Sequence, residues 1–413
     1  MIYLDNHATT RVAPEVLRAM LPYFTEDYGN AASINHAFGW RAAEAVEQAR
    51  EQVARQLNCP ADWIAFTSGA TEANNLAIKG IVTSRSLVGR LSKPSKSSTL
   101  MTAADLPGFE NRATKNMPHF ITNVAEHHSV LDVAKRLQRN GIDVTLLPVD
   151  RFGQVDPQQV ADAITPQTVL ISLMLANNEV GTLNPIEAIG QICRQQDILL
   201  HCDAVQAFGK LPIDLSQLPV DLLSLTAHKL HGPKGAGALV VRRDRRRIPI
   251  EPLFDGGGHE QHLRSGTLPV PLIVGFGAAC ELSVDMSAIA ERMSSLRDRL
   301  WQRLQSELSG LSLNGHLAAR LPHNLNVSFA GVDGEALMTS LKTIAVSSGS
   351  ACSTAEPEPS HVLRAMGVSE SLSRASLRFG LSRYTTEAEI EAAAHEVVAV
   401  VKRLRGGGPN EPH

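Results

Sequence analysis

Two residues at the ends of apolar segments have the types needed to hold an aldehyde cofactor. Lys229 follows the apolar residues 222–225, and a lysine at a strand end can form a Schiff base with such a cofactor. Asp203 follows the apolar residues 198–202, about one βαβ step earlier. An aspartate there can pair with a pyridinium nitrogen. Gln206, three residues on, is suitably placed to hydrogen-bond a ring oxygen if a helical turn begins there.

Residues 67–72, Thr-Ser-Gly-Ala-Thr-Glu, could bind a phosphate. They lie between a predicted strand and a helical run at 73–79, where small residues and a helix N-terminus favour anions. The same pattern is commonly only a helix cap. The sequence contains neither GxxxxGK[ST] nor a GxGxxG after its first strand, which argues against nucleotide binding.

A histidine and a cysteine are further candidates. His127 follows the predicted strand at 119–124 and could stack on a flat ring and shuttle protons. Taken alone, it reads better as a polar loop histidine. Cys352 lies among small, polar residues at 347–354. Free cysteines are usually buried, but these neighbours suit an exposed loop and a reactive thiol.

The elements that must position these residues alternate between strands and helices. Strands are predicted at 64–67, 119–124, 143–148, 169–175, 198–202, 222–225 and 238–241, with helices at 129–140 and 185–196. Residues 15–57 read as helices broken at Gly29-Asn30. The alternation predicts an α/β fold with a mostly parallel seven-stranded sheet. Ligands bind such sheets beyond the carboxyl ends of the strands.

A second, smaller α+β domain is predicted after this sheet. A long helix is expected at 274–308, then strands near 324–329 and 345–347, and helices to 403. The predicted organisation is an N-terminal segment at 1–14 that packs on the small domain, a large domain at 15–265, a small domain at 266–405 and a disordered tail at 406–413. Residues 83–118, rich in Ser, Lys, Thr and Gly, are expected to form a mobile surface insertion.

Composition argues against nucleic-acid-binding, membrane-spanning and disulfide-bonded proteins. The 413 residues are 43% hydrophobic and 20% charged, with a net charge of −3, so nucleic acid is not an expected partner. The basic run at 242–247 reads as a solvated strand end. No apolar stretch approaches the roughly 18 residues that span a membrane, and the N-terminus does not resemble a signal peptide. The five scattered cysteines favour neither disulfides nor a metal site and suggest a cytoplasmic location.

Together the motifs resemble the cysteine desulfurases, in the class V branch of fold-type I pyridoxal-5′-phosphate (PLP) enzymes. The matching stretches span about residues 3–390 in family order: LDNHATT, GNAASINHAFG, FTSGATEANNLAIKG, AEHHSVLD, NNEVGT, HCDAVQAFGKLPID, TAHKLHGPKGAGAL, GGGHEQHLRSGT, SSGSACS and LRFGLSRYTT. The resemblance implies that Lys229 forms the Schiff base, Asp203 pairs with the pyridine nitrogen and Gln206 binds the ring oxygen. It makes His127 the residue that stacks on the ring and transfers protons, and Cys352 the nucleophile.

The resemblance also assigns the remaining ligands. It places Ala70, Thr71, Thr226 and His228 at the phosphate, with Thr267 reaching it from the second subunit of a homodimer. Thr226 stands where many relatives carry serine, and its hydroxyl can still donate.

For the substrate, the resemblance implies that Asn178, which also contacts the cofactor, and Arg378 bind the carboxylate of L-cysteine, Arg378 as a bidentate fork. The products would be L-alanine and a persulfide on Cys352, the sulfur passing to an acceptor such as an iron–sulfur scaffold protein. Cys352 would also be a possible transient cluster ligand. The chain departs from the family in its longer 83–118 region and in ending with a Gly-Pro tail, where housekeeping members carry a scaffold-docking segment.

Two other functions fit parts of this pattern. A class V lyase or aminotransferase would share Lys229 and Asp203 but would need no loop thiol. A sulfur-relay partner without catalysis would have lost Lys229, Asp203 or Arg378, and all three are present.

Overall fold

A computed structural model describes residues 1–91, 117–283, 285–348 and 359–406. Cys352, residues 92–116 of the expected insertion and residues 407–413 of the tail lie outside these described residues. Residues 83–91, expected to begin the insertion, instead continue helix α4 (Ala70–Leu91). The apolar stripe of this helix extends beyond the predicted run at 73–79, with Ile81 and Val82 buried against the sheet.

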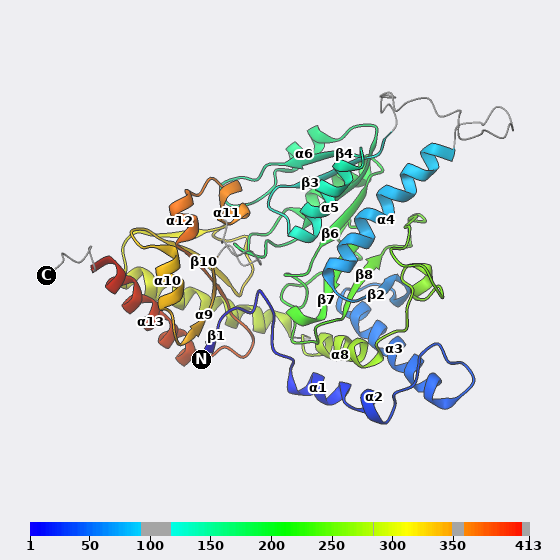
Figure 1. Cartoon of the computed structure of the whole chain (residues 1–413), viewed down its shortest axis with the longest axis horizontal. Coiled ribbons are helices and arrows are strands. Elements are labelled where there is room, and N and C mark those ends of the chain that lie inside the picture. Colours follow the sequence, from blue (N-terminus) through cyan, green and yellow to red (C-terminus); the bar gives the residue numbers. More distant parts are fainter. Residues whose placement is uncertain (92–116, 284, 349–358, 407–413) are drawn as a thin grey trace, which may run out of the picture.

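A seven-stranded sheet forms the centre of the larger part of the chain (Figure 1). Its order is β2-β8-β7-β6-β5-β3-β4, and β8 runs antiparallel to the other six strands. The seven predicted strands are confirmed to within two residues at each end. They are β2 (Ile64–Thr67), β3 (His119–Asn123), β4 (Asp143–Leu147), β5 (Thr168–Met174), β6 (Leu199–Asp203), β7 (Leu222–Thr226) and β8 (Gly237–Val241).

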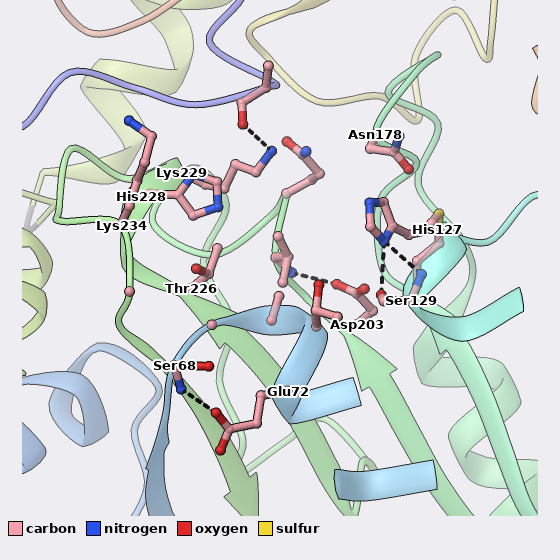
Figure 2. Close-up of a pocket in the computed structure, with 18 of the residues that line it drawn as sticks. Ser68, Glu72, His127, Ser129, Asn178, Asp203, Thr226, His228, Lys229 and Lys234 are labelled. Atoms are coloured by element: carbon pink, nitrogen blue, oxygen red, sulfur yellow. Dashed lines mark hydrogen bonds between the residues drawn. The ribbon is translucent and has the colours of Figure 1, made fainter. Parts of the chain in front are cut away.

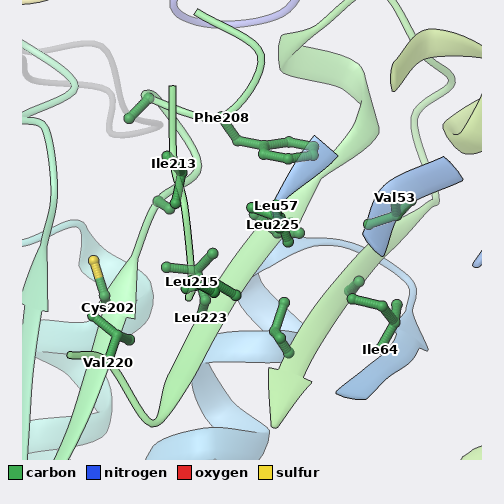
Figure 3. Packing of buried hydrophobic residues seen from close by; sticks show 14 of the residues in the cluster. Val53, Leu57, Ile64, Cys202, Phe208, Ile213, Leu215, Val220, Leu223 and Leu225 are labelled. Atoms are coloured by element: carbon green, nitrogen blue, oxygen red, sulfur yellow. The ribbon is translucent and has the colours of Figure 1, made fainter. Parts of the chain in front are cut away.

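Both faces of this sheet are covered by helices, since successive strand residues point to opposite faces. Leu223 of β7 packs into the core with helices α3, α7 and α8, whereas Leu222 packs into the core with α4 and α5. Figure 3 shows Leu225 beside Leu57 and Leu223 beside Leu215 in this core. The helices of this part are α1 (Pro14–Met20), α2 (Pro22–Thr25), α3 (Ala37–Gln56), α4, α5 (His128–Arg139), α6 (Pro157–Ala163), α7 (Ile186–Gln195) and α8 (Val270–Glu281), with short 3-10 turns at Ala61–Trp63, Ala227–Lys229 and Glu260–His262. Of these, α1 and α2 pack on α8.

The prediction of a single long helix at 274–308 is wrong. The chain forms two helices, α8 and α9 (Met286–Glu307), bent by 79°. Asp285 begins the second helix, because its side chain accepts a hydrogen bond from the backbone N–H of Ala288. Within the described residues no single helix is long and apolar enough to cross a membrane, although α8 and α9 taken together meet that test of length and composition.

A smaller antiparallel sheet, in the order β12-β13-β10-β9, packs with α9 and α13. Strand β1 lies beside β11, so the N-terminus joins this part of the molecule (Figure 1). The elements are β1 (Ile2–Tyr3), β9 (Leu311–Asn314), β10 (Asn324–Phe329), β11 (Ile344–Ala345), β12 (Ser347–Ser348), β13 (Ser376–Gly380), α10 (Gly334–Ser340), α11 (His361–Ala365), α12 (Glu370–Arg374) and α13 (Glu387–Gly406).

Candidate active site

A cavity of about 430 Å³ lies beyond the carboxyl ends of the parallel strands (Figure 2). Strand β6 ends at Asp203 and β7 at Thr226, and a short 3-10 turn then carries Lys229. Most of the residues predicted for the site line this cavity: Ala70, Thr71, His127, Asn178, Asp203, Gln206, Thr226, His228 and Lys229.

The side chain of Lys229 lies against the N-terminal segment. Its Nζ donates hydrogen bonds to the main-chain oxygen of Ala8, at 2.9 Å, and to that of His7. Sequence reasoning placed the N-terminal segment with the small domain and did not expect it at the lysine. The match at LDNHATT marked this segment as part of the family pattern but did not place it at the lysine.

The carboxylate of Asp203 is buried and held by two donors. Its Oδ1 accepts from the backbone N–H of Val205 at 3.0 Å, and its Oδ2 accepts from Nδ2 of Asn74 at 2.8 Å. The Nδ2 of Asn74 also donates to Oγ of Ser129 at 2.8 Å. Asn74 was missed by sequence reasoning, although it lies two residues after the predicted phosphate motif. These bonds fix the direction in which the carboxylate faces the cavity.

His127 begins α5, and its ring is fixed by that role. Its Nδ1 accepts a hydrogen bond from the backbone N–H of Ser129 at 3.1 Å, so in the neutral ring the proton lies on Nε2. Burial lowers the pKa of His127, and the nearby carboxylate of Asp203 opposes that shift. The neutral, flat ring at the cavity wall fits the predicted stacking role.

The predicted phosphate end contains the start of α4, whose first N–H groups have no partner within the helix. Thr226 donates from Oγ1 to the oxygen of Ala236 at 3.2 Å. A Cβ at Gly237 would lie 2.5 Å from Cα of Gly69, so only glycine allows this close approach of β8 to the loop. Burial, and then the charges of Lys229 and Lys234, lowers the pKa of His228 to about 4. Lys234 lines the cavity and was not predicted.

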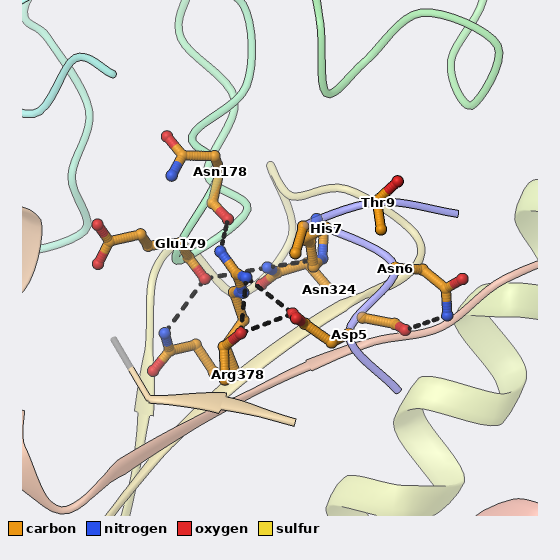
Figure 4. A network of polar contacts seen from close by, with 12 residues as sticks. Asp5, Asn6, His7, Thr9, Asn178, Glu179, Asn324 and Arg378 are labelled. Atoms are coloured by element: carbon orange, nitrogen blue, oxygen red, sulfur yellow. Dashed lines mark hydrogen bonds and ion pairs between the residues drawn. The ribbon is translucent and has the colours of Figure 1, made fainter. Parts of the chain in front are cut away.

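Arg378 and Asn178 meet at one side of the site (Figure 4). Arg378 donates from Nη1 to the main-chain oxygen of Asn178, at 2.9 Å, and from Nη2 to Oδ1 of Asp5, at 2.9 Å, and Oγ of Ser347, at 3.1 Å. Its Nε and the Oδ1 of Asn178 are buried without a hydrogen-bond partner among the described residues. Arg378 is not among the residues that line the cavity. The carboxylate-binding role therefore stays a prediction.

For two other predicted residues the structure gives no support at the cavity. Thr267 is exposed and does not line it, and its expected contact with a second subunit is untested. Cys352 lies outside the described residues.

The four described cysteines are poor nucleophiles. Burial raises the pKa of Cys59 and of Cys193 to about 12, and it also raises that of Cys202 and Cys280. Thiolates at these positions are therefore disfavoured. No group of three or more potential metal ligands occurs in the part of the chain that the structure describes.

The sequence matches the aminotransferase class-V family over residues 2–90 and 99–393. It is 51% identical to "Cysteine desulfurase IscS" from Anaeromyxobacter sp. (strain Fw109-5) over 99% of this chain and 94% of that protein. It is 44% identical to the protein of the same name from Rickettsia africae (strain ESF-5), over 99% and 93%.

Solved structures of similar proteins share the fold. One described as "NIFS-LIKE PROTEIN" has a TM-score of 0.84 and 36% identity, covering 98% of this chain and all of that one. Another, "SspA in complex with cysteine", has a TM-score of 0.78 and 37% identity, covering 94% of this chain and 100% of that one. The observed α/β architecture is thus that of the predicted fold class.

Proposed function

The chain belongs to the aminotransferase class-V family, and on that premise we propose that it is a PLP-dependent cysteine desulfurase. It converts L-cysteine to L-alanine and keeps the sulfur as a persulfide on Cys352. The observation that carries this proposal is that Lys229 and the oriented carboxylate of Asp203 line the same cavity. The similar proteins named cysteine desulfurase, and the related structure described as a complex with cysteine, support the choice of substrate.

The residues of the cavity fit PLP. Asp203 would hold the ring nitrogen and Gln206 the ring oxygen, with His127 against the ring face. Ala70, Thr71, Thr226 and His228 would hold the phosphate, a role supported by the start of α4 and by the close approach of Gly69 to Gly237. When bound, PLP withdraws electrons from the Cα of an amino acid joined to it and so makes that carbon acidic.

The chain's own residues would then orient the substrate and move protons. Lys229, whose Nζ is held near the cavity by the carbonyls of Ala8 and His7, would take the Cα proton. His127 would carry a proton on Nε2, the nitrogen not used in capping α5. Arg378 would bind the substrate carboxylate through its Nε, a donor that is buried without a partner among the described residues, and Asn178 would donate from its side-chain NH₂ group.

The sulfur transfer would need a thiolate that the described cysteines do not offer. Sγ of Cys352 would attack the substrate sulfur, forming the S–S bond as the S–Cβ bond breaks. The electron pair of that bond would return to the substrate carbon, which is protonated and leaves as alanine. The persulfide sulfur would pass to an acceptor such as an iron–sulfur scaffold protein.

The proposal includes a homodimer in the cytoplasm. Support for the dimer comes from large apolar side chains exposed around α1, α2 and the start of α3, namely Leu21, Phe24, Tyr28, Ile34 and Trp40. Thr267 would contact the phosphate of the partner subunit. Support for a reducing compartment such as the cytoplasm comes from four free thiols, those of Cys59, Cys193, Cys202 and Cys280. Sedimentation of the purified protein tests the dimer.

The deciding experiment incubates the holoprotein with L-cysteine and a reductant and measures alanine, sulfide and pyruvate. Wild type and the control Cys59→Ser should form equal amounts of alanine and sulfide, whereas Cys352→Ser should form neither. Undiminished sulfide from Cys352→Ser, or pyruvate in place of alanine, would identify a lyase instead. A protein that stays colourless after PLP is added would contradict the cofactor and revive the relay function.

A further inference from the structure

His7 holds both ends of the Gln206 amide. Its ring Nδ1 lies 3.1 Å from Oε1 of Gln206, and its main-chain oxygen accepts a hydrogen bond of 3.1 Å from Nε2 of Gln206. His7 is 1% exposed and Gln206 5% exposed, so water does not compete for these bonds. A carbonyl oxygen can only accept, and the amide nitrogen of Gln206 must therefore face it.

The position of the proton on the His7 ring follows from a second carbonyl. Nδ2 of Asn324 lies 3.1 Å from the main-chain oxygen of Glu179 and 3.1 Å from Nε2 of His7 (Figure 4). Since the carbonyl of Glu179 can only accept, the Asn324 amide presents its NH₂ group to both partners. Nε2 of His7 is then an acceptor, and Nδ1 carries the proton that is donated to Gln206.

The surroundings favour this neutral ring. Burial lowers the pKa of His7 well below its ordinary value, and the charges of Arg378, Lys210 and Lys229 act in the same direction. The ring stacks on that of His323 with centroids 4.3 Å apart. A Cβ at Gly380 would lie 2.7 Å from Cδ2 of His7, so only glycine at 380 leaves room for the ring there.

We propose that His7 is a positioning residue that orients Gln206 as a hydrogen-bond donor toward the cofactor. Nε2 of Gln206 uses one hydrogen on the His7 carbonyl, which leaves the second for the ring oxygen of PLP in the cavity that Gln206 lines. Because Asn324 belongs to β10 of the smaller sheet, that sheet sets the His7 tautomer and thereby the donor. This inference rests on PLP as the cofactor under the proposed function, but not on desulfuration.

The first test reads the tautomer directly. In protein labelled with ¹⁵N-histidine, nitrogen chemical shifts distinguish a protonated ring nitrogen from an unprotonated one, and the His7 signals are those missing from His7→Phe. Wild type should carry the proton on Nδ1. Asn324→Asp, which replaces the donor with an acceptor, should move it to Nε2 or protonate both nitrogens.

Asn326→Ala is the matched control, because Asn326 donates to the same Glu179 oxygen at 3.1 Å but has no hydrogen bond to His7. It should keep the proton on Nδ1. A proton on Nε2 in wild type would overturn the proposal.

The second test uses the visible absorbance of the holoprotein between pH 6 and 10. A donor to the ring oxygen weakens that oxygen's hold on the proton of the neighbouring Schiff-base nitrogen. His7→Phe removes the Nδ1–H bond that holds Oε1 of Gln206 and so frees the amide to turn its donor away from the ring oxygen. It should therefore raise the pH midpoint of the absorbance change by about one unit. His323→Phe, which alters the stacked neighbour and leaves the Gln206 bonds, should show no shift. An unchanged midpoint in folded His7→Phe would contradict the proposal.

If His7→Phe does not fold, Asn324→Asp takes its place in the absorbance test, and the His7 signals of wild type are identified instead by their shift in Asn324→Asp. An unchanged midpoint in that variant would count equally against the role of His7. A protein with the expected tautomer and midpoint that makes no alanine would leave the His7 role standing and overturn the proposed reaction alone.

Discussion

Nδ2 of Asn74 lies 2.8 Å from Oδ2 of Asp203, and both side chains are buried. A hydrogen bond to a charged group contributes about 1.5–3 kcal/mol. Replacing Asn74 by Ala removes this bond and the orientation that it gives to the carboxylate. We expect the PLP affinity of Asn74→Ala to fall about tenfold or more, measured by titrating apoprotein with PLP. Asn75, one residue along, donates to the main-chain oxygen of Thr71 in its own helix, so Asn75→Ala should bind PLP as wild type does.

Thr226 tests the hydroxyl at the predicted phosphate end. It is 1% exposed and lines the cavity, and its hydroxyl can turn from the oxygen of Ala236 to a phosphate. Thr226→Val keeps the shape but removes the hydroxyl, and we expect about a tenfold loss of PLP affinity. Thr226→Ser retains the donor and should bind PLP within about twofold of wild type. Equal affinities for the two variants would show that the hydroxyl does not contact the cofactor.

Glu179 should make stability depend on pH. Burial raises its pKa to about 7 from an ordinary 4.5, and Ser360 and Arg378 oppose the shift. A carboxyl with a raised pKa in the folded state favours folding below pH 4.5 and loses that contribution as pH rises to 7. Glu179→Gln cannot ionise. We therefore measure the free energy of unfolding of both proteins in urea at pH 5 and at pH 8. Between these pH values wild type should lose up to about 3 kcal/mol relative to Glu179→Gln. Glu187→Gln, at an exposed position, should leave the pH dependence of the free energy of unfolding as it is in wild type. An identical pH dependence in wild type and Glu179→Gln would refute the raised pKa.

Glu260 forms a buried ion pair that should matter for stability. Its oxygens accept from Nη1 and Nη2 of Arg50 at 2.8 and 2.9 Å, and from the backbone N–H of Phe66 at 2.6 Å. Removing one partner leaves a buried charge unpaired, so Glu260→Gln should lose about 3 kcal/mol in urea unfolding. Glu281→Gln breaks the exposed pair with Arg55, 2.9 Å apart, and should lose less than about 1 kcal/mol. Comparable losses in both variants would mean that the burial of Glu260 has no energetic effect.

The sequence by itself determined the local features of this protein. Apolar runs placed the seven strands, and the positions of Asp203 and Lys229 shortly after two of them placed these residues at the edge where the cavity lies. These features were predictable because strand pairing brings the carboxyl ends of parallel strands together. The break between α8 and α9 was missed because apolar periodicity continues through it, and the Asp285 cap was not recognised.

Only the tertiary structure decided the contacts that orient the site. Asn74 meets Asp203 across 129 residues, His7 meets Gln206 across 199, and Asn324 meets His7 across 317. Each depends on how helices, the N-terminal segment and the smaller sheet pack together. Periodicity and motif spacing report the preferences of neighbouring residues and carry no information about such distant pairs. The residue types were therefore readable from the chain, whereas the directions of their hydrogen bonds were set by packing.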